Sequence, residues 1–302
     1  MIIQNETFES PTLIQSYIDI CETGFHSQVK NAIDTLLCNT NLKFIMLAGP
    51  TCAGKTTTAN ILCNAFTRVG KNLRTISIDD FFYDTNHINR ASANFSDEID
   101  YDSPQALDLE YFEKCAVNII NEKCAYIPKF DFNVGKRIGY TGFEPSDNDI
   151  IVFEGIQAIY PEVTAHLPAG HSEKIFIDIT DGLLVHGISF EKTELRLIRR
   201  IVRDYRFRSA SPEFTLYLWD SVRRNEEKNI YPYVDGDCVK IDSLLGYEMN
   251  MIKNQFLEIT ENTDRNSEYF TRIQKTREKL SRIPGIGIEY LPENSVYREF
   301  LR

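Results

Sequence analysis

Short apolar runs alternate with longer segments of helical periodicity along most of this chain. The runs 44–48, 73–78, 150–153 and 174–179 have the length of buried strands, and segments with helical spacing separate them. A strand that is covered on both faces is apolar throughout, so this pattern predicts an α/β fold with a parallel sheet flanked by helices. Ligands bind at the carboxyl ends of the strands in such sheets, which makes the residues after each run candidates for a site.

Local periodicity and polarity predict the remaining segments. Apolar residues at helical spacing indicate an amphipathic helix over 26–38. No internal repeat, low-complexity tract or composition break indicates a second independent domain. Further along, we expect a loop or flap over the site at 83–102, a helix at 104–121, a hairpin-like excursion at 126–143 and a mostly helical C-terminal third to about residue 280.

The composition is that of an ordinary globular protein of 302 residues, 42% hydrophobic and 25% charged. The formal net charge of -11 argues against a general nucleic-acid binder, so we expect a small-molecule acceptor as the partner and leave a homo-oligomer open. Seven cysteines without a C-x-x-C pair indicate reduced thiols. There is no basic leader with an apolar core and no apolar run near about 18 residues, so we expect a cytoplasmic location and no membrane partner.

The segment GPTCAGKT at 49–56 matches the phosphate-loop pattern G-x-x-x-x-G-K-[ST] and stands between a predicted strand and a helix-like stretch. Glycines let the backbone curl so that N–H groups point inward, and the following helix adds its positive end. We predict that Lys55 contacts the phosphates of ATP and Thr56 binds Mg²⁺. A lowered thiol pKa is physically possible for Cys52 beside Lys55. The predicted nucleotide-binding residues are Gly49, Pro50, Thr51, Cys52, Ala53, Gly54, Lys55, Thr56, Thr57 and Arg208.

Acidic residues follow two of the predicted strands. Asp79 and Asp80 come at the end of the run 73–78, and Glu154 follows 150–153. Phosphoryl transfer needs a carboxylate that accepts the proton of the attacking hydroxyl, and Asp79 and Asp80 are both well placed for this role. The alternative is that these aspartates cap the loop or coordinate Mg²⁺ as structural ligands. Glu154 stands where phosphate-loop enzymes carry the acid that organises Mg²⁺.

Arginines recur at helical spacing between 194 and 208. Such a run ordinarily forms a solvated helix face. Beside a phosphate loop, however, arginines of a closing lid can neutralise the transferring phosphoryl group and contribute about 10³- to 10⁵-fold in rate. Arg200, Arg203 and Arg208 are therefore candidates within the run Arg196, Arg199, Arg200, Arg203, Arg206 and Arg208.

Several motifs together resemble the uridine kinase and phosphoribulokinase family of P-loop kinases. In chain order they are GPTCAGKTT, ISIDDFFYD, YDSPQALDLEYF, PKFDF, IVFEGIQAIY and LIRRIVRDYRFR. The later RRNEEKNIYPY, YEM and SVYREFL are similar to a bacterial subgroup in which such a kinase unit is often attached to a synthetase-like N-terminal half. The resemblance runs from about Leu42 to the C-terminus, and it implies a five-stranded parallel sheet of the nucleoside monophosphate kinase type, with ATP and Mg²⁺ as cofactors.

The resemblance also implies roles for individual residues. Residues 1–41 would be an N-terminal helical extension, and 42–302 the kinase domain with a lid at about 194–230 and a helical C-terminal region. Phe81 and Phe82 would lie beside the substrate pocket. The implied catalytic residues are Asp79, Lys55, Arg200 and Arg203, the substrate-binding residues are Asp79, Phe82, Tyr101, Asp102, Phe130 and Arg137, and the metal-binding residues are Thr56 and Glu154.

Two departures from the family pattern concern the acceptor. Gly135 stands where uridine kinases carry a histidine that reads the pyrimidine, and Phe130 replaces a tyrosine. We predict ATP-dependent phosphorylation of a primary hydroxyl, the 5′-hydroxyl of a nucleoside such as uridine or cytidine. The alternatives are a sugar phosphate or a pantothenate-like alcohol as acceptor, or a nucleotide-binding regulatory module with weak catalysis. The sequence has no N-K-x-D guanine motif, which disfavours a GTPase but leaves ATP against GTP as donor open.

Overall fold

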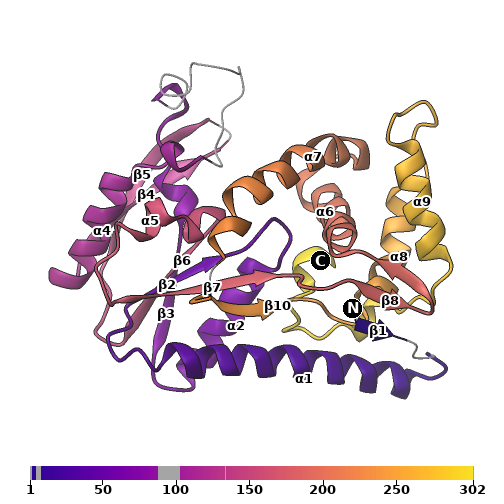
Figure 1. Ribbon diagram of the computed structural model, residues 1–302, viewed down its shortest axis with the longest axis horizontal. Helices are drawn as coiled ribbons and strands as arrows, with labels where there is room; N and C mark the ends of the chain where they lie inside the picture. The colour runs from indigo at the N-terminus through magenta and orange to yellow at the C-terminus, as the bar shows by residue number, and fades with distance from the viewer. Residues whose placement is uncertain (1, 5–7, 88–102, 133, 235, 302) are drawn as a thin grey trace.

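The computed structural model describes residues 2–4, 8–87, 103–132, 134–234 and 236–301. Its centre is a sheet of five strands in the order β10-β7-β2-β6-β3, and every neighbouring pair runs parallel (Figure 1). The predicted parallel sheet flanked by helices is therefore confirmed. The strands are β2 (Phe44–Ala48), β3 (Asn72–Ser77), β6 (Asp149–Glu154), β7 (Ser172–Asp178) and β10 (Val239–Asp242).

Alternate residues of the central strand β2 point to opposite faces of the sheet. Ile45 and Leu47 belong to one buried apolar cluster, whereas Phe44 and Met46 belong to another. All four side chains are fully buried. Both faces of the sheet are therefore covered, which explains why this strand is apolar at every position.

Two helices pack on the face of the sheet that carries Ile45 (Figure 1). The prediction of a first helix over 26–38 was wrong about where the helix begins. The helix starts 15 residues earlier, because the Ser10 side chain accepts a hydrogen bond from Leu13 N at 3.3 Å and caps it. Its buried side chains share a cluster with the sheet, so it is part of the main core. These helices are α1 (Pro11–Leu36) and α2 (Lys55–Thr67).

A helix and an antiparallel hairpin cover the opposite face. The Phe81 ring packs edge to face on Phe112, with 5.3 Å between centroids, and the Phe112 ring lies 4.8 Å from that of Phe153. The hairpin confirms the excursion predicted for 126–143. The elements here are α4 (Leu109–Asn121), β4 (Ala125–Asp131), β5 (Lys136–Phe143), α5 (Pro161–Thr164) and the short 3-10 helices η1 (Ile78–Phe81), η2 (Pro104–Ala106) and η3 (Ile156–Ile159).

The C-terminal third is mostly helical, as predicted, and its last turn returns to α2 and α6. The edge strand β10 was not predicted, because its four residues alternate between apolar and polar. No helix in the described ranges is long and apolar enough to cross a membrane. The remaining elements are α6 (Lys192–Arg208), α7 (Pro212–Asn229), α8 (Glu248–Ile259), α9 (Phe270–Ser281), α10 (Arg298–Leu301), η4 (Tyr231–Tyr233), η5 (Ile288–Tyr290) and a small sheet of β1 (Ile2–Gln4), β8 (Leu183–Val185) and β9 (Ile188–Phe190).

Candidate functional site

The phosphate loop, residues 49–57, leaves the carboxyl end of β2 and enters α2. A Cβ atom on Gly49 would lie 2.2 Å from the Ile177 carbonyl oxygen on β7, so only glycine allows this close approach. Gly54 has φ +93°, in the left-handed region that favours glycine. The curled path of the loop therefore depends on Gly49 and Gly54.

Lys55 begins α2, and its side chain folds back over the loop. Its Nζ atom donates to the carbonyl oxygens of Gly49 at 2.9 Å and Pro50 at 3.0 Å. Burial lowers the pKa of the Lys55 ammonium, and the negative charge of Glu154 is the largest influence in the opposite direction. The lysine is thus positioned across the loop, beside the strand-end acids.

Glu154 ends β6 and lies in register with Leu47 on one side and Ser77 on the other. The carboxylate therefore lies at the carboxyl edge of three adjacent strands. Burial raises the pKa of Glu154, while the Lys55 charge and a hydrogen bond with Ser77 act to lower it. The predicted metal-binding acid and the predicted phosphate-binding lysine are close enough to influence each other.

Asp79 and Asp80 lie in η1, just beyond β3, and their side chains have different neighbours. The Asp79 Oδ1 atom lies 3.9 Å from where a Cβ on Gly155 would stand, and its charge acts on Lys55. Asp80 instead accepts a hydrogen bond from Phe130 N at 3.1 Å and lies 3.6 Å from Lys129 Nζ. Asp80 therefore holds the β4–β5 hairpin, and Asp79 is the aspartate nearer the phosphate loop.

The aromatic residues predicted beside the acceptor form one cluster. The Phe82 ring packs edge to face on Phe130, with 5.6 Å between centroids, and on Phe132 at 5.8 Å. Phe82 and Phe130 are buried, whereas Phe132 is 54% exposed. Tyr101 and Asp102, the predicted ribose contacts, lie outside the described residues. Phe132, which the sequence analysis did not select, is the exposed ring of this cluster.

Arg137, predicted to bind the acceptor, joins the hairpin to η1. Its Nε atom donates to the Phe82 carbonyl oxygen at 2.9 Å, and its Nη2 atom to that of Phe81 at 2.8 Å. Its Nη1 atom pairs with Asp108 at 2.9 Å. These bonds hold the segment that carries Asp79, so Arg137 has a positioning role here, and its contact with an acceptor stays a prediction.

Gly135 lies in the turn of the hairpin with φ +64°, in the left-handed region. A Cβ at this position would lie 2.1 Å from the Thr85 Oγ1 atom. Thr85 also donates to the Gly135 carbonyl oxygen from its backbone N at 2.8 Å and from Oγ1 at 2.9 Å. The left-handed backbone and the nearby Thr85 hydroxyl would strain any side chain at this position, so the local structure favours glycine over a histidine.

The arginines of α6 do not form a solvated face, and that interpretation was wrong for most of them. Arg196 and Arg199 are at most 1% exposed, and Arg200 is 8% exposed. The Arg200 Nε atom lies 3.1 Å from Asp204, and the Arg203 Nη2 atom lies 2.6 Å from it. The more exposed Arg208 lies 3.6 Å from the same carboxylate.

Three residues at the phosphate loop were missed by the sequence analysis. Buried Glu226 forms a bidentate pair with Arg196, at 2.9 and 2.5 Å, and accepts a hydrogen bond from Thr51 N at 3.3 Å. Glu299 accepts bonds from Thr57 N and Oγ1, both at 3.3 Å. Asp204 could have been found from its i, i+4 spacing to Arg200 and Arg208. Glu226 and Glu299 lie in the motifs RRNEEKNIYPY and SVYREFL, to whose glutamates the sequence analysis gave no role.

Cys52 lies inside the loop with φ +58° and is 2% exposed. Burial raises the pKa of its thiol, with the Arg203 charge opposing. The lowered pKa considered from the sequence is therefore wrong in direction, because burial outweighs the neighbouring cations. A thiol held in its protonated form is a poor redox centre.

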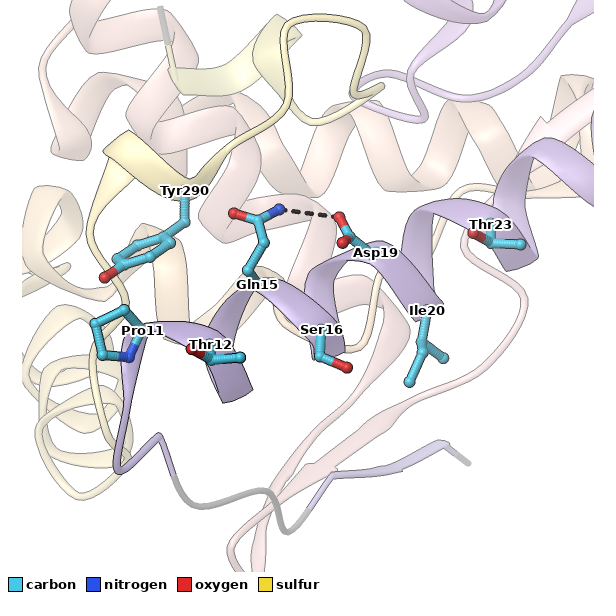
Figure 2. A pocket seen from close by; sticks show the side chains of 8 residues that line it. All are labelled: Pro11, Thr12, Gln15, Ser16, Asp19, Ile20, Thr23 and Tyr290. Carbon is cyan, nitrogen blue, oxygen red and sulfur yellow. Dashed lines mark hydrogen bonds between the residues drawn. The ribbon is translucent and has the colours of Figure 1, made fainter.

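A hollow over the first turns of α1 lies elsewhere, where Tyr290 faces Pro11 (Figure 2). The Gln15 Nε2 atom donates to Asp19 Oδ1 at 2.9 Å on its wall. Its lining holds one carboxylate and neither lysine nor arginine, so it does not suit an anionic nucleotide. The lining residues are Pro11, Thr12, Gln15, Ser16, Asp19, Ile20, Thr23 and Tyr290.

Comparison with known proteins places the similarity on the segment that builds this site. A family model described as the Phosphoribulokinase / Uridine kinase family matches residues 44–244. A curated protein named Uridine kinase from Ureaplasma parvum serovar 3 is 31% identical over 179 residues, which cover 59% of this chain and 76% of that relative. A Uridine kinase from Lactobacillus helveticus is 27% identical and covers 55% and 70%, respectively. The solved phosphoribulokinase from Rhodobacter spheroides aligns with a TM-score of 0.41 at 17% identity, over 64% of this chain and 67% of that one.

Proposed function

This chain belongs to the phosphoribulokinase and uridine kinase family of P-loop kinases, and we propose that it phosphorylates the 5′-hydroxyl of a nucleoside, uridine or cytidine, with ATP as donor. The kinase activity is inferred from membership of this family. The nucleoside acceptor is supported by two relatives named Uridine kinase, which are 31% and 27% identical to this chain. ATP supplies the γ-phosphoryl group when it is bound.

The phosphate loop suits a triphosphate because its backbone N–H groups donate hydrogen bonds to carboxylates of the protein itself. Carboxylates occupy the donors at both ends of the loop, Glu226 at Thr51 and Glu299 at Thr57. The glycine positions leave no room for side chains over the backbone. Lys55 spans the loop and can turn its ammonium group toward bound phosphates. These residues would hold the nucleotide, together with the positive end of α2.

Asp79 is our proposed general base. It lies beyond the carboxyl end of β3 and close enough to Lys55 for the two charges to interact, whereas its neighbour Asp80 is engaged with the hairpin. A carboxylate in this place can accept the proton of an attacking hydroxyl. Arg137 and the buried Phe81 fix the segment on which Asp79 stands, which holds the base in one position.

Mg²⁺ would be held by Thr56 and Glu154. Mg²⁺ in such sites takes one or two carboxylates together with phosphate oxygens and water, so a dense cluster of protein ligands is not required. The half-buried Glu154 carboxylate has a raised pKa, and a bound cation would favour its ionised form.

The acceptor is tested with a panel of nucleosides, sugar phosphates and pantothenate-like alcohols, each incubated with ATP, Mg²⁺ and the protein while ADP release is measured. We expect uridine or cytidine to give the highest kcat/KM. A preference for a sugar phosphate or a pantothenate-like alcohol would reassign the acceptor. Because Gly135 replaces the pyrimidine-reading histidine, we also expect weak discrimination between the two pyrimidines. Tight ATP binding without turnover of any acceptor would favour a regulatory module.

A further inference from the structure

The C-terminal segment 295–301 lies against the phosphate loop, although it lies beyond residues 44–244, which match the family. A Cβ atom on Gly54 would lie 2.8 Å from the Val296 Cγ2 atom. The side chains of Val296, Tyr297 and Phe300 are fully buried. This segment is therefore a fixed part of the core beside the loop.

The side chain of Arg199 connects this segment to the phosphate loop. Its guanidinium carbon lies 4.9 Å from the centroid of the Phe300 ring and 5.5 Å from that of Tyr297. Its Nη1 atom donates to the Cys52 carbonyl oxygen at 3.3 Å, and it forms a fully buried ion pair with Glu248. The Tyr297 hydroxyl donates to the Glu248 carbonyl oxygen at 3.2 Å. The buried Arg199 side chain thus contacts both the phosphate loop and the C-terminal segment.

Glu299 projects from this anchored segment onto the first turn of α2. Its Oε2 atom accepts from Thr57 N and from Thr57 Oγ1, both at 3.3 Å. The N–H groups of a first helical turn have no partner within their own helix, so they are the donors that a phosphate loop offers to phosphates. A carboxylate at this helix end is also favoured by the helix dipole.

The charges around Glu299 make this carboxylate different from Glu226 at the other end of the loop. Glu226 is neutralised by the buried Arg196 and by Arg223, whereas Glu299 has no ion-pair partner within 4.0 Å in the part of the chain that the structure describes. Its negative charge acts on Lys55, on Arg203 and on Glu154, which are all predicted site residues. Glu299 is therefore a carboxylate at the place expected for phosphates, within electrostatic reach of Lys55 and Arg203 but without a close ion-pair partner among the described residues.

We propose that Glu299 is an internal occupant of the nucleotide site, whose carboxylate holds the Thr57 donors in the free protein and must yield them when a nucleotide binds. This inference rests on the nucleotide binding proposed above. Two anions cannot share the same donors without mutual repulsion, so Glu299 weakens nucleotide binding and sets its affinity. Because the segment that carries Glu299 is anchored by Tyr297 and Phe300, the side chain can swing away while the backbone stays in place.

The test is the dissociation constant of ADP, measured by isothermal titration calorimetry in EDTA so that a metal ion does not contribute. In Glu299→Gln and Glu299→Ala we expect ADP to bind on the order of 10-fold more tightly than in the wild type, because one negative charge at the phosphates is gone. Glu293→Gln is the matched control, since Glu293 is exposed two residues before this segment and the substitution removes the same charge. It should leave the dissociation constant unchanged.

Unchanged or weaker ADP binding in both Glu299 variants would overturn the proposal, and weaker binding would show that Glu299 helps to hold the ligand. Equal tightening in Glu293→Gln would also overturn it, because the effect would then be one of general charge. If neither the wild type nor the variants bind ADP, the proposed nucleotide site fails as well. Thermal unfolding of each variant checks that the fold is intact, and the alanine variant provides a second reading if the glutamine variant is unstable.

Discussion

Asp79 and Asp80 are neighbours in sequence, but their side chains serve different parts of the molecule. Asp80 accepts a hydrogen bond from the hairpin backbone at Phe130, and Asp79 lies near Gly155 and Lys55. The sequence predicted that an acid at the end of β3 would matter and preferred Asp79 on family resemblance. The separate neighbours of the two carboxylates could not be predicted, because they depend on the hairpin's position over η1.

Replacing Asp79 with asparagine should separate binding from chemistry. In Asp79→Asn we expect turnover to fall by about 10²-fold or more, because the attacking hydroxyl loses its proton acceptor, while the dissociation constant of ATP changes little. The measurement is kcat together with ATP binding by calorimetry. Asp80→Asn is the matched control. It should lower the melting temperature while leaving kcat close to the wild-type value. Near-normal turnover in Asp79→Asn would remove Asp79 as the base.

Glu154 should give the free protein a pH-dependent stability. Burial raises the pKa of this carboxyl in the folded state, so its favourable contribution is complete at low pH and is lost as the pH rises through the raised pKa. Glu154→Gln lacks this loss. As the pH rises above the ordinary range of a carboxyl pKa, we expect its melting temperature to rise relative to that of the wild type, while Mg²⁺-dependent turnover falls. The exposed Glu261→Gln should show no such trend, and a pH-independent difference for Glu154→Gln would contradict this account.

At the scale of elements, the strand and helix order around the phosphate loop was predictable and the hairpin turn was not. Local apolar runs are sufficient to locate β2 and β6, because both are buried on two faces. The edge strand β10 alternates between apolar and polar residues, and the first half of α1 depends on a cap at Ser10. Gly135 was recognised as a departure, but its reason, the contact with Thr85, requires the folded structure.

The hairpin turn should not tolerate a side chain at Gly135. In Gly135→Ala we expect a loss of about 1 to 3 kcal/mol in the free energy of unfolding, because the left-handed backbone and the nearby Thr85 hydroxyl both oppose a Cβ atom. Gly139→Ala, in β5 of the same hairpin, meets nothing within 4 Å and should change the stability little. Urea unfolding of the two variants measures the difference. Equal free energies of unfolding for Gly135→Ala and Gly139→Ala would show that a side chain at position 135 does not strain the turn.

At the scale of the whole molecule, segments distant in sequence converge on the phosphate loop. Glu226 from α7, Arg199 from α6 and Glu299 from α10 all contact it within 3.3 Å. Helix α6 is thus tied to the loop by the buried Arg199 and, through the buried Arg196, by Glu226. No local sequence pattern reveals these contacts, because they join residues more than 140 positions apart. The phosphate-loop pattern predicted the loop, and the family resemblance included SVYREFL without giving Glu299 a role beside it.

The central claim is transfer of a phosphoryl group to a nucleoside 5′-hydroxyl. The most direct measurement is ³¹P NMR of the product formed when the wild-type protein, ATP and Mg²⁺ are incubated with an equimolar mixture of uridine, cytidine, a sugar phosphate and a pantothenate-like alcohol. We predict a phosphomonoester coupled to the 5′-methylene protons of a pyrimidine nucleoside. A phosphate ester on the sugar phosphate or the pantothenate-like alcohol alone, with both nucleosides unchanged, would contradict the account.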